Sequence, residues 1–477
     1  MDRKINTQNL MLSCKYYSKD LMKCIFKKKF LLLFSIVHLA NLAAESLSSD
    51  DWPNWRGPAY NGSMITSHYL PHDFSKSKGV KWKAQLPGPS AATPIVVGEN
   101  VFVSSIAIDS SGSSPAIGEL MALCYNRNDG GLAWSHNAGS GYRPSGDGFD
   151  YKLDSKSNYA SPSPVSNGKF VVFFYGNGDL ACFKMDGTRV WSRNIQKDYG
   201  NFCFQWTFSA SPTFYQDRLY LAVLQRDEPV HGRGIKGADS YILCINPENG
   251  KTIWKVIRPS SAKKESLEAF GTIIPVNGQL VIAGGDVLTG HDPLNGVEMW
   301  RWGTWNPGHR QEWWRLVPSP VYGDGVLLVC APKRAPVYAI RSGLVGNHGP
   351  KSGLIWNSSD KDDLTSDVPT PLFYENKFFI LSDLKKSLSR VDPSTGEVEW
   401  CIDLPGKYKW RSSPSAGNGM IFVMNHNASI LVVASETGKI LNLAKMGEEY
   451  EDNVRSSVSI SKGNLFIRTN KNLYCIE

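Results

Sequence analysis

The chain of 477 residues lacks the short patterns that most directly indicate chemistry. It contains no adjacent cysteine pair, no cysteine and histidine spacing typical of zinc, no glycine-rich phosphate loop and no nucleophile-elbow motif. A long low-complexity tract is also absent, and 42% of the residues are hydrophobic and 11% aromatic. This composition indicates a folded globular protein and excludes a disordered one.

The apolar run near the N-terminus is too short for a typical membrane span. It covers about 13 residues, from Phe30 to Leu42, whereas a spanning helix needs ~20. The run follows three lysines and precedes small residues, which is the order of a secretory signal. We therefore expect a signal peptide at 1–44, an N-terminal extension at 45–79, and no transmembrane span after cleavage. An uncleaved anchor is the alternative.

Positive charge is scarce outside this leader. The whole chain has a net charge of +8, but residues 1–44 hold eight Lys or Arg and only two Asp or Glu. Six of the eight net charges therefore lie in the leader and two remain for the rest. No broad basic surface is indicated, so we expect no nucleic-acid partner.

Cysteines are few, and most of them follow a repeat. Without Cys14 and Cys24 of the leader, seven remain. Four of these recur once per repeat, about ten residues before the tryptophan that ends the outer strand of the repeat described below, or its equivalent. This recurrence indicates small buried residues rather than disulfides. They are Cys124, Cys182, Cys244 and Cys475. The other three leave open one bridge within the set Cys203, Cys330 and Cys401.

A repeat of roughly 40 to 60 residues is the dominant pattern of the chain. A Gly-bearing turn is followed by a short strand that usually ends in tryptophan, as in Asn249-Gly250 to Trp254. A large ring on an outer strand covers the seam between repeats while its N–H finds a carbonyl. We therefore expect a docking role for seven tryptophans: Trp82, Trp134, Trp191, Trp254, Trp300, Trp356 and Trp400.

Each repeat also predicts three further strands. A small residue and proline precede an apolar strand, an Asn-Gly type turn leads into a second strand, and a third precedes the tryptophan turn. Four antiparallel strands make a propeller blade. The last unit, 455–477, lacks its outer strand, which Val80-Lys81-Trp82-Lys83-Ala84 supplies. We predict an all-β fold, a single eight-bladed β-propeller of four-stranded antiparallel blades over 80–477, closed by an N-terminal strand.

These motifs resemble the PQQ-like repeat family. The clearest copies of its Asp-Pro-x-x-Gly-x-x-x-Trp motif are 391–400 and 245–254. The family includes eight-bladed quinoprotein alcohol dehydrogenases and the non-catalytic assembly lipoprotein BamB. The opening of the exported part, 51–58, is similar to that of secreted bacterial proteins with these repeats and no assigned activity. The resemblance implies the fold more than an activity.

The resemblance also implies what an enzyme of this family would need. In its quinoprotein members, PQQ lies between a Trp and a disulfide of adjacent cysteines, and oxygen ligands hold Ca²⁺ beside a catalytic Asp. This chain has no adjacent cysteines, and a Glu, Asn, Asp ligand set does not align. Glu268, Asp286 and Glu312 are the carboxylates available as candidate ligands. We therefore expect no cofactor, no metal and no catalytic residues, with PQQ and calcium as the alternative.

Long insertions gather in the two classes of loop that share one face of the propeller, where binding usually resides. The densest is 305–315, with aromatic and arginine residues that favour an anionic or planar group or a protein hot spot. Packing of this loop onto the propeller is the alternative for it. The candidate binding residues are Trp305, His309, Arg310, Glu312, Trp313, Trp314, Arg315, Tyr142, Arg143, His231 and Arg233.

The sequence thus favours an exported, periplasmic or secreted, monomeric and non-catalytic scaffold. We expect it to bind a protein or other envelope macromolecule through the loop-rich face. The alternatives are a PQQ- and calcium-dependent dehydrogenase with a divergent site, and the binding of a small ligand or glycan.

Overall fold

The computed structural model describes residues 47–107, 119–146, 158–361 and 364–477, and Leu47–Glu477 forms one compact unit. The predicted signal peptide at 1–44 lies outside these residues. Among the described residues, no helix combines the length and apolar character needed to cross a bilayer.

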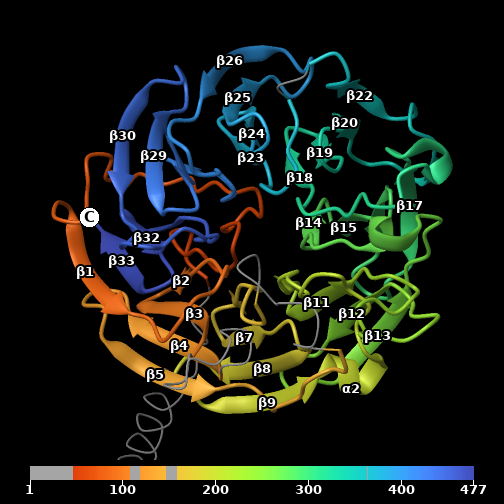
Figure 1. The fold of residues 1–477 in the computed structure, drawn as a ribbon, viewed down its shortest axis with the longest axis horizontal. Coiled ribbons are helices and arrows are strands. Elements are labelled where there is room, and N and C mark those ends of the chain that lie inside the picture. The colour runs from red at the N-terminus through yellow and green to blue at the C-terminus, as the bar shows by residue number, and fades with distance from the viewer. Residues whose placement is uncertain (1–46, 108–118, 147–157, 362–363) are drawn as a thin grey trace, which may run out of the picture. The chain divides into compact units, whose positions relative to one another are not determined.

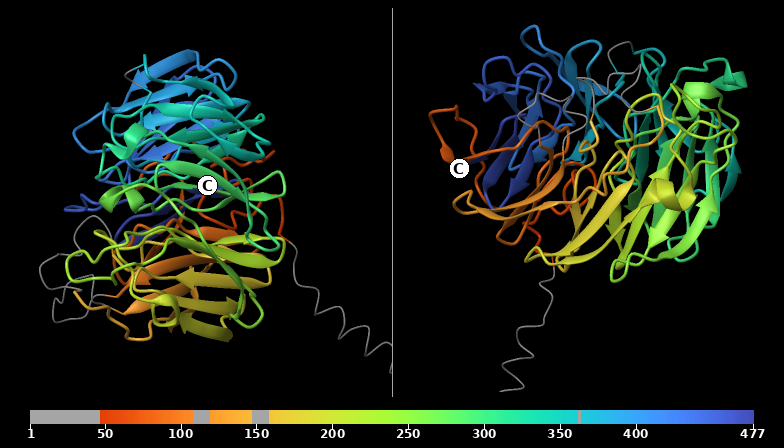
Figure 2. Two further views of the ribbon diagram at one scale, coloured as in Figure 1. Left: turned by 90° about the vertical axis from the view of Figure 1, so that its right-hand side faces the viewer. Right: turned by 60° about the horizontal axis from the view of Figure 1, so that its bottom comes forward.

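Eight sheets, antiparallel except for one added strand, surround a common axis, which confirms the predicted eight-bladed propeller (Figure 1). Blades 1 to 8 follow chain order, and Figure 2 shows their twisted sheets side by side around the axis. The innermost strands are short and almost wholly buried: β2 (Ile95–Val97), β6 (Val165–Ser166), β10 (Thr213–Tyr215), β14 (Ile274–Val276), β18 (Val321–Gly323), β23 (Leu372–Tyr374), β27 (Ser415–Gly417) and β31 (Ser459–Ser461).

The middle strands of each blade are rich in β-branched and aromatic residues, which favour a buried pleated strand. The second strands are β3 (Asn100–Ile106), β7 (Phe170–Phe174), β11 (Arg218–Val223), β15 (Gln279–Gly284), β19 (Val326–Cys330), β24 (Lys377–Ser382), β28 (Met420–Met424) and β32 (Asn464–Arg468). The third strands are β4 (Leu120–Asn126), β8 (Asp179–Lys184), β12 (Tyr241–Ile245), β16 (Val287–His291), β20 (Val337–Arg341), β25 (Ser387–Val391), β29 (Ser429–Ala434) and β33 (Asn472–Ile476).

The outer strands tend to alternate exposed and covered residues, because one face meets the next blade and the other meets water. They are β5 (Leu132–Asn137), β9 (Arg189–Asn194), β13 (Thr252–Ile257), β17 (Glu298–Gly303), β22 (Leu354–Asn357), β26 (Val398–Asp403), β30 (Ile440–Lys445) and, for blade 8, β1 (Val80–Gln85). Strand β1 pairs antiparallel with β33, as predicted, so the ring has no open edge between its termini. The described helices are short: α2 (Ile195–Tyr199), η2 (Lys264–Leu267) and η3 (Pro307–His309).

The outer-strand tryptophans join neighbouring blades through their indole N–H groups. Trp191 donates to the Pro247 carbonyl at 2.7 Å, in the turn of the next blade. The glycine of that turn, Gly250, lies against the same indole, where an added Cβ would be 2.6 Å from the ring. Its positive φ of 71° adds a second reason for glycine. The turn and tryptophan of the repeat are therefore two halves of one contact.

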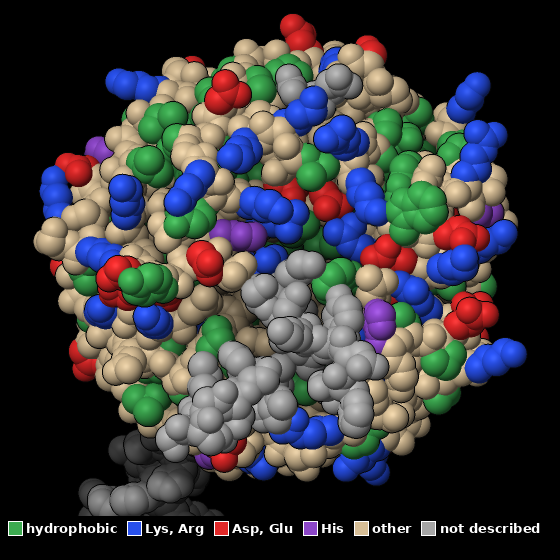
Figure 3. Space-filling model, viewed as in Figure 1, with side chains coloured by type: hydrophobic (Ala, Val, Ile, Leu, Met, Phe, Trp, Pro, Cys, Tyr) green, Lys and Arg blue, Asp and Glu red, His purple; other side chains and the backbone are tan. Residues whose placement is uncertain are grey.

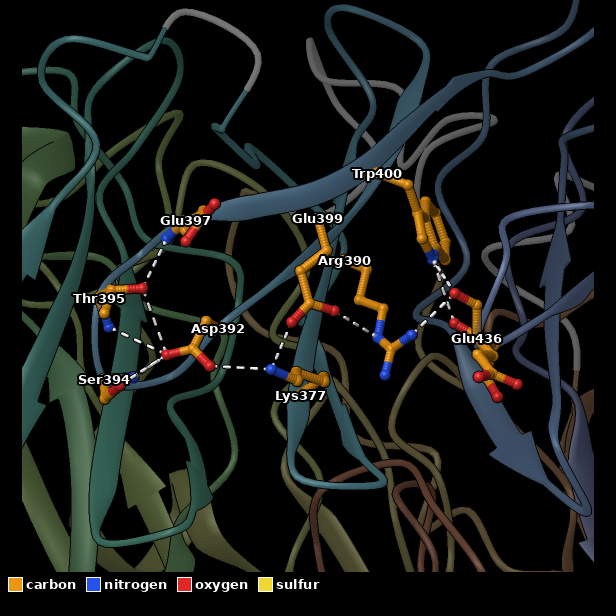
Figure 4. A network of polar contacts seen from close by, with 10 residues as sticks. Lys377, Arg390, Asp392, Ser394, Thr395, Glu397, Glu399, Trp400 and Glu436 are labelled. Atoms are coloured by element: carbon orange, nitrogen blue, oxygen red, sulfur yellow. Dashed lines mark hydrogen bonds and ion pairs between the residues drawn. The ribbon is translucent and has the colours of Figure 1, made fainter.

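Figure 4 shows this contact between blades 6 and 7. The Trp400 indole donates to the Glu436 carbonyl at 3.1 Å, and Arg390 donates to the same oxygen at 2.8 Å. Arg390 also pairs with Glu399, which binds Lys377. The turn of blade 7 is thus an acceptor that Trp400 and Arg390 of blade 6 share.

Trp300 departs from the predicted docking role. Its indole donates to the Gln279 side chain of its own blade at 2.7 Å, and Trp302 instead reaches the Ser352 carbonyl in blade 5 at 3.0 Å. A fifth strand, β21 (Gly346–His348), pairs parallel with β17 here. This insertion occupies the edge where the standard contact would form, so the docking position moves by two residues.

The repeated cysteines lie directly opposite the docking tryptophans on the neighbouring strand. Cys124 pairs with Trp134, Cys182 with Trp191, Cys244 with Trp254, and Cys475 with Trp82. Burial raises the pKa of each of these thiols, so they are inert small residues. The seven described cysteines are all free, so the bridge left open among Cys203, Cys330 and Cys401 does not form.

The N-terminal extension closes one end of the channel, and its orange-red trace enters the ring in Figure 1. Residues 50–64 make hydrogen bonds to seven of the eight blades. At their centre Arg56 is buried and donates to the carbonyls of Asn61, Pro371 and Pro414. This segment is therefore a plug across the ends of the inner strands.

Candidate functional site: an axial cavity on the loop-rich face

A closed ring of hydroxyl groups surrounds the axis. Each blade places a Ser or Thr two residues before its inner strand, and the backbone N–H of that residue donates to the hydroxyl oxygen of the next blade. The eight N···O distances range from 2.8 to 3.3 Å, and the members are Thr93, Ser163, Ser211, Thr272, Ser319, Thr370, Ser413 and Ser457.

The ring explains the small residue and proline with which each repeat begins. In six of the eight blades the residue after the ring hydroxyl is proline, which has no N–H to satisfy inside the narrow channel. Buried backbone donors need partners, and here each blade supplies one to its neighbour. The Ser or Thr that marks the start of each inner strand, followed by proline in most blades, therefore also makes the hydrogen bonds between blades at the axis.

A second ring lies two residues before the first, since alternate residues of an extended chain face the same side. Its members are small in blades 1 to 3, apolar in blades 4 to 6 and basic in blades 7 and 8. They are Ala91, Ser161, Ser209, Phe270, Val317, Val368, Arg411 and Arg455. This asymmetry makes one side of the channel basic.

These rings enclose a cavity of about 430 Å³. The Trp55 indole lies at its closed end and donates to Thr272 at 3.1 Å. Trp206 and Thr207 contribute to one wall, and Arg315 and Lys409 extend the basic side beyond the second ring. A concave site with mixed aromatic, hydroxyl and cationic walls is suited to a small polar ligand.

His426 lies beside this basic side, where its backbone N–H donates to the Lys409 carbonyl at 2.9 Å. His426 is buried, and this burial, together with Arg455, Arg411 and Lys409, lowers its pKa to about 3, so it is neutral at pH 7. In Figure 3, Lys and Arg side chains lie above the centre of this face, with some Asp and Glu side chains among them. The described lining of the cavity contains no carboxylate.

The predicted loop 305–315 divides into anchors and exposed residues. Trp305 is buried in the hydrophobic core, and Trp314 packs partly against the same cluster. Trp313 is 52% exposed and Arg310 is exposed, so these two face solvent. Arg315 lines the cavity and forms a bidentate pair with Asp367 at 3.1 and 3.2 Å. Packing thus accounts for Trp305 and part of Trp314, and the binding role of the exposed residues stays a prediction.

His309 and Glu312 hold the loop in place. His309 Nδ1 lies 3.2 Å from buried Asp286, and its Nε2 lies 2.8 Å from Ser261 Oγ. This order resembles that of a serine hydrolase triad. Asp286 also accepts from Asn306 at 2.9 Å, so we assign the group to anchoring the loop. Glu312 pairs with Lys264 at 2.5 Å.

The other predicted binding residues lie apart from the cavity lining. The Tyr142 hydroxyl donates to Asn201, and Arg143 and His231 are exposed. Arg233 is buried and donates to the Gln205 carbonyl at 2.6 Å. Of the predicted residues, Arg315 alone belongs to the described lining.

The residues present do not fit a calcium-bound quinone. In the described part of the chain, no three His, Cys, Asp or Glu side chains lie close enough to hold a metal. Glu268 is engaged by Arg226 and by the Gln205 N–H, and burial raises its pKa to about 7. Asp286 and Glu312 have the separate partners described above. A hard cation needs converging oxygen ligands, and the cavity offers cations instead.

Sequence reasoning missed the basic residues of blades 7 and 8. Lys409, Arg411 and Arg455 lie in ordinary connecting segments. A signal was present, because Arg411 and Arg455 each stand two residues before the Ser that opens a repeat. Comparing that position across all eight repeats would have indicated the basic side.

Comparison with known proteins agrees with the architecture. The profile of the family described as outer membrane protein assembly factor BamB matches residues 73–226 and 118–344, more than half of the chain. No curated protein matches the chain. The structure of BamB from Moraxella catarrhalis is 12% identical with a TM-score of 0.53, over 82% of this chain and 95% of that one.

Two quinoprotein structures are also similar. The quinohemoprotein alcohol dehydrogenase ADHIIG from Pseudomonas putida HK5 is 12% identical with a TM-score of 0.60, over 91% of this chain and 80% of that one. A europium-containing methanol dehydrogenase is 10% identical with a TM-score of 0.62, over 90% and 98%. Such low identity shows the fold alone. From the family profile and the eight closed blades, the chain belongs to the BamB-like family of PQQ-repeat β-propellers.

Proposed function

We propose that the protein is an exported, non-catalytic propeller that binds a protein or other envelope macromolecule through its loop-rich face. The observation behind this proposal is the axial cavity among the connecting segments of that face, opposite the end closed by residues 50–64. Among the described residues, the plug leaves the axial cavity at the other end of the ring. Binding residues on loops above a rigid scaffold are a common arrangement.

The exposed part of loop 305–315 supplies the surface around this site. Trp313 presents a large aromatic side chain to solvent, and Arg310 lies exposed beside it. Trp and Arg are enriched among residues that dominate binding energy. Because Trp305 is buried and Trp314 half-buried, the exposed pair is held on an anchored loop. Such an arrangement loses little conformational entropy on binding.

The family supports an envelope location. Its description is that of an outer membrane protein assembly factor, and the N-terminal sequence has the order of a secretory signal. An exported scaffold would meet macromolecules of that compartment.

A site-specific photo-crosslinker distinguishes the two faces of the propeller. A benzophenone amino acid replaces Trp313 in one variant and Ile65, which is 92% exposed in the N-terminal extension, in the control. Both variants are expressed in the producing organism and irradiated. We expect a discrete adduct from position 313 and none from position 65. Adducts from position 65 alone, or from neither position, would contradict binding through the loop-rich face.

A further inference from the structure

Two arginines stand at the same position of adjacent blades and face the axial cavity. Arg411 and Arg455 each stand two residues before a ring serine, where blades 1 to 6 have small or apolar residues. Their side chains line the cavity with Lys409, which lies two residues before Arg411. Three basic side chains therefore lie on one side of the cavity.

The structure fixes the direction of Arg411. Its Nε donates to buried Asp383 at 2.9 Å, and Asp383 is held in turn by the Asp367 N–H at 3.0 Å. A guanidinium has five N–H donors, and this contact uses one of them. The terminal nitrogens therefore remain as donors on an oriented group. Among the described residues, Lys409 has no ion pair.

The opposite side of the cavity has different chemistry. Trp206 and Phe270 supply aromatic surface, and the first ring supplies hydroxyl groups at the closed end. A volume of about 430 Å³ accommodates a single small ring compound. Cations on one side and aromatic groups on the other suit a cyclic molecule with one acidic substituent.

We propose that the axial cavity binds a ring-sized oxyanion, such as a sugar or similar cyclic group bearing a carboxylate or sulfate, without a metal ion. Lys409 and the terminal nitrogens of Arg411 hold the oxyanion, Arg455 lies beside them in the lining, and Trp206 and Phe270 contact the ring. This inference rests on the proposed function, because it names the group that a partner presents to the loop-rich face. Charge-assisted hydrogen bonds to an oxyanion are roughly twice as strong as neutral ones.

The absence of a metal requirement follows from the wall itself. The side-chain cations themselves neutralise the charge of the oxyanion. A calcium ion in that role would need carboxylate ligands, and the described lining contains no carboxylate. A chelator should therefore leave binding intact. Salt should weaken binding, since charge attraction is screened.

Titration calorimetry tests the inference on protein that has been treated with EDTA and then dialysed free of it, with three probes: glucuronate, inorganic sulfate and uncharged glucose. Lys409→Met is the main variant, because Lys409 is exposed and its removal leaves no buried charge behind. Lys439→Met, at an exposed turn of the same blade, is its matched control. Arg411→Lys keeps the positive charge but loses the planar set of guanidinium N–H donors.

We expect glucuronate to bind and glucose not to bind. Lys409→Met should weaken glucuronate about tenfold, Arg411→Lys should weaken it as well, and Lys439→Met should leave it unchanged. Inorganic sulfate, which has no ring, should compete with glucuronate for the site. Equal binding of glucose, equal effects of the two lysine variants, or loss of glucuronate binding after metal removal would overturn the inference.

The crosslinking experiment separates the two proposals. If position 313 still forms its adduct while no anionic probe binds, the oxyanion site is wrong and the loop-rich face remains a binding surface. If the probes bind but no adduct forms, the cavity serves a free small ligand and the macromolecular partner is wrong.

Discussion

Replacing one hydroxyl of the axial ring measures how much the ring contributes to the fold. Ser413 is buried and accepts the Thr370 N–H at 3.0 Å. Ser413→Ala removes that acceptor and leaves a buried backbone donor unpaired, which costs about 1–3 kcal/mol. Its own N–H still donates to Ser457. We expect a lower Tm and faster hydrogen exchange at the Thr370 amide.

Two further variants separate this effect from a general loss of packing. Ser413→Thr keeps the oxygen, and threonine already stands at three ring positions, so its loss of stability should be smaller. Ser359→Ala, at an exposed serine, should change stability by no more than about 0.5 kcal/mol. Thermal unfolding and exchange at the 368–372 segment are the assays. Equal Tm values for Ser413→Ala and Ser359→Ala, with unchanged exchange, would refute the reasoning.

Three other outcomes follow from contacts in the structure. Gly62→Ala should lower Tm more than Gly141→Ala, because both have positive φ but only the first would place a Cβ 2.1 Å from the Arg56 guanidinium. Because the folded pKa of His426 is lowered to about 3, its contribution to stability is present above the unfolded value of 6.5 and is lost as pH falls toward 3. His426→Gln should therefore gain stability relative to the native protein between pH 7 and pH 4, and a constant Tm difference would oppose this. A fluorophosphonate probe should leave Ser261 unlabelled if the Asp286, His309 and Ser261 chain only anchors its loop, and stoichiometric labelling at Ser261 would show otherwise.

The architecture could be predicted from the sequence because each weak signal recurs in most of the eight blades. The turn glycine, the outer tryptophan and the opening Ser-Pro or Thr-Pro pair each recur at most blade interfaces. Trp300 shows the limit of this reasoning. Its motif is intact, but β21 pairs with β17 at that edge, and Trp302 makes the contact instead. The motif around Trp300 gives no sign that β21, more than 40 residues later, pairs at this edge.

The candidate site was harder to predict because its residues come from different blades. Loop 305–315 stood out by composition, yet the folding of Trp305 into the core depends on tertiary packing. Arg411 and Arg455 are unremarkable in sequence and become neighbours only because blades 7 and 8 are adjacent at the axis. The channel plug of residues 50–64 likewise depends on partners hundreds of residues away, such as Pro414 for Arg56.

A crystal of the protein soaked with selenate tests the oxyanion site most directly, because selenium gives an anomalous signal and selenate has the charge and shape of sulfate. We predict an anomalous peak inside the axial cavity, within hydrogen-bond distance of Arg411 and Lys409, that disappears in Lys409→Met. Peaks confined to the outer surface, or a cavity peak unaffected by Lys409→Met, would contradict the account.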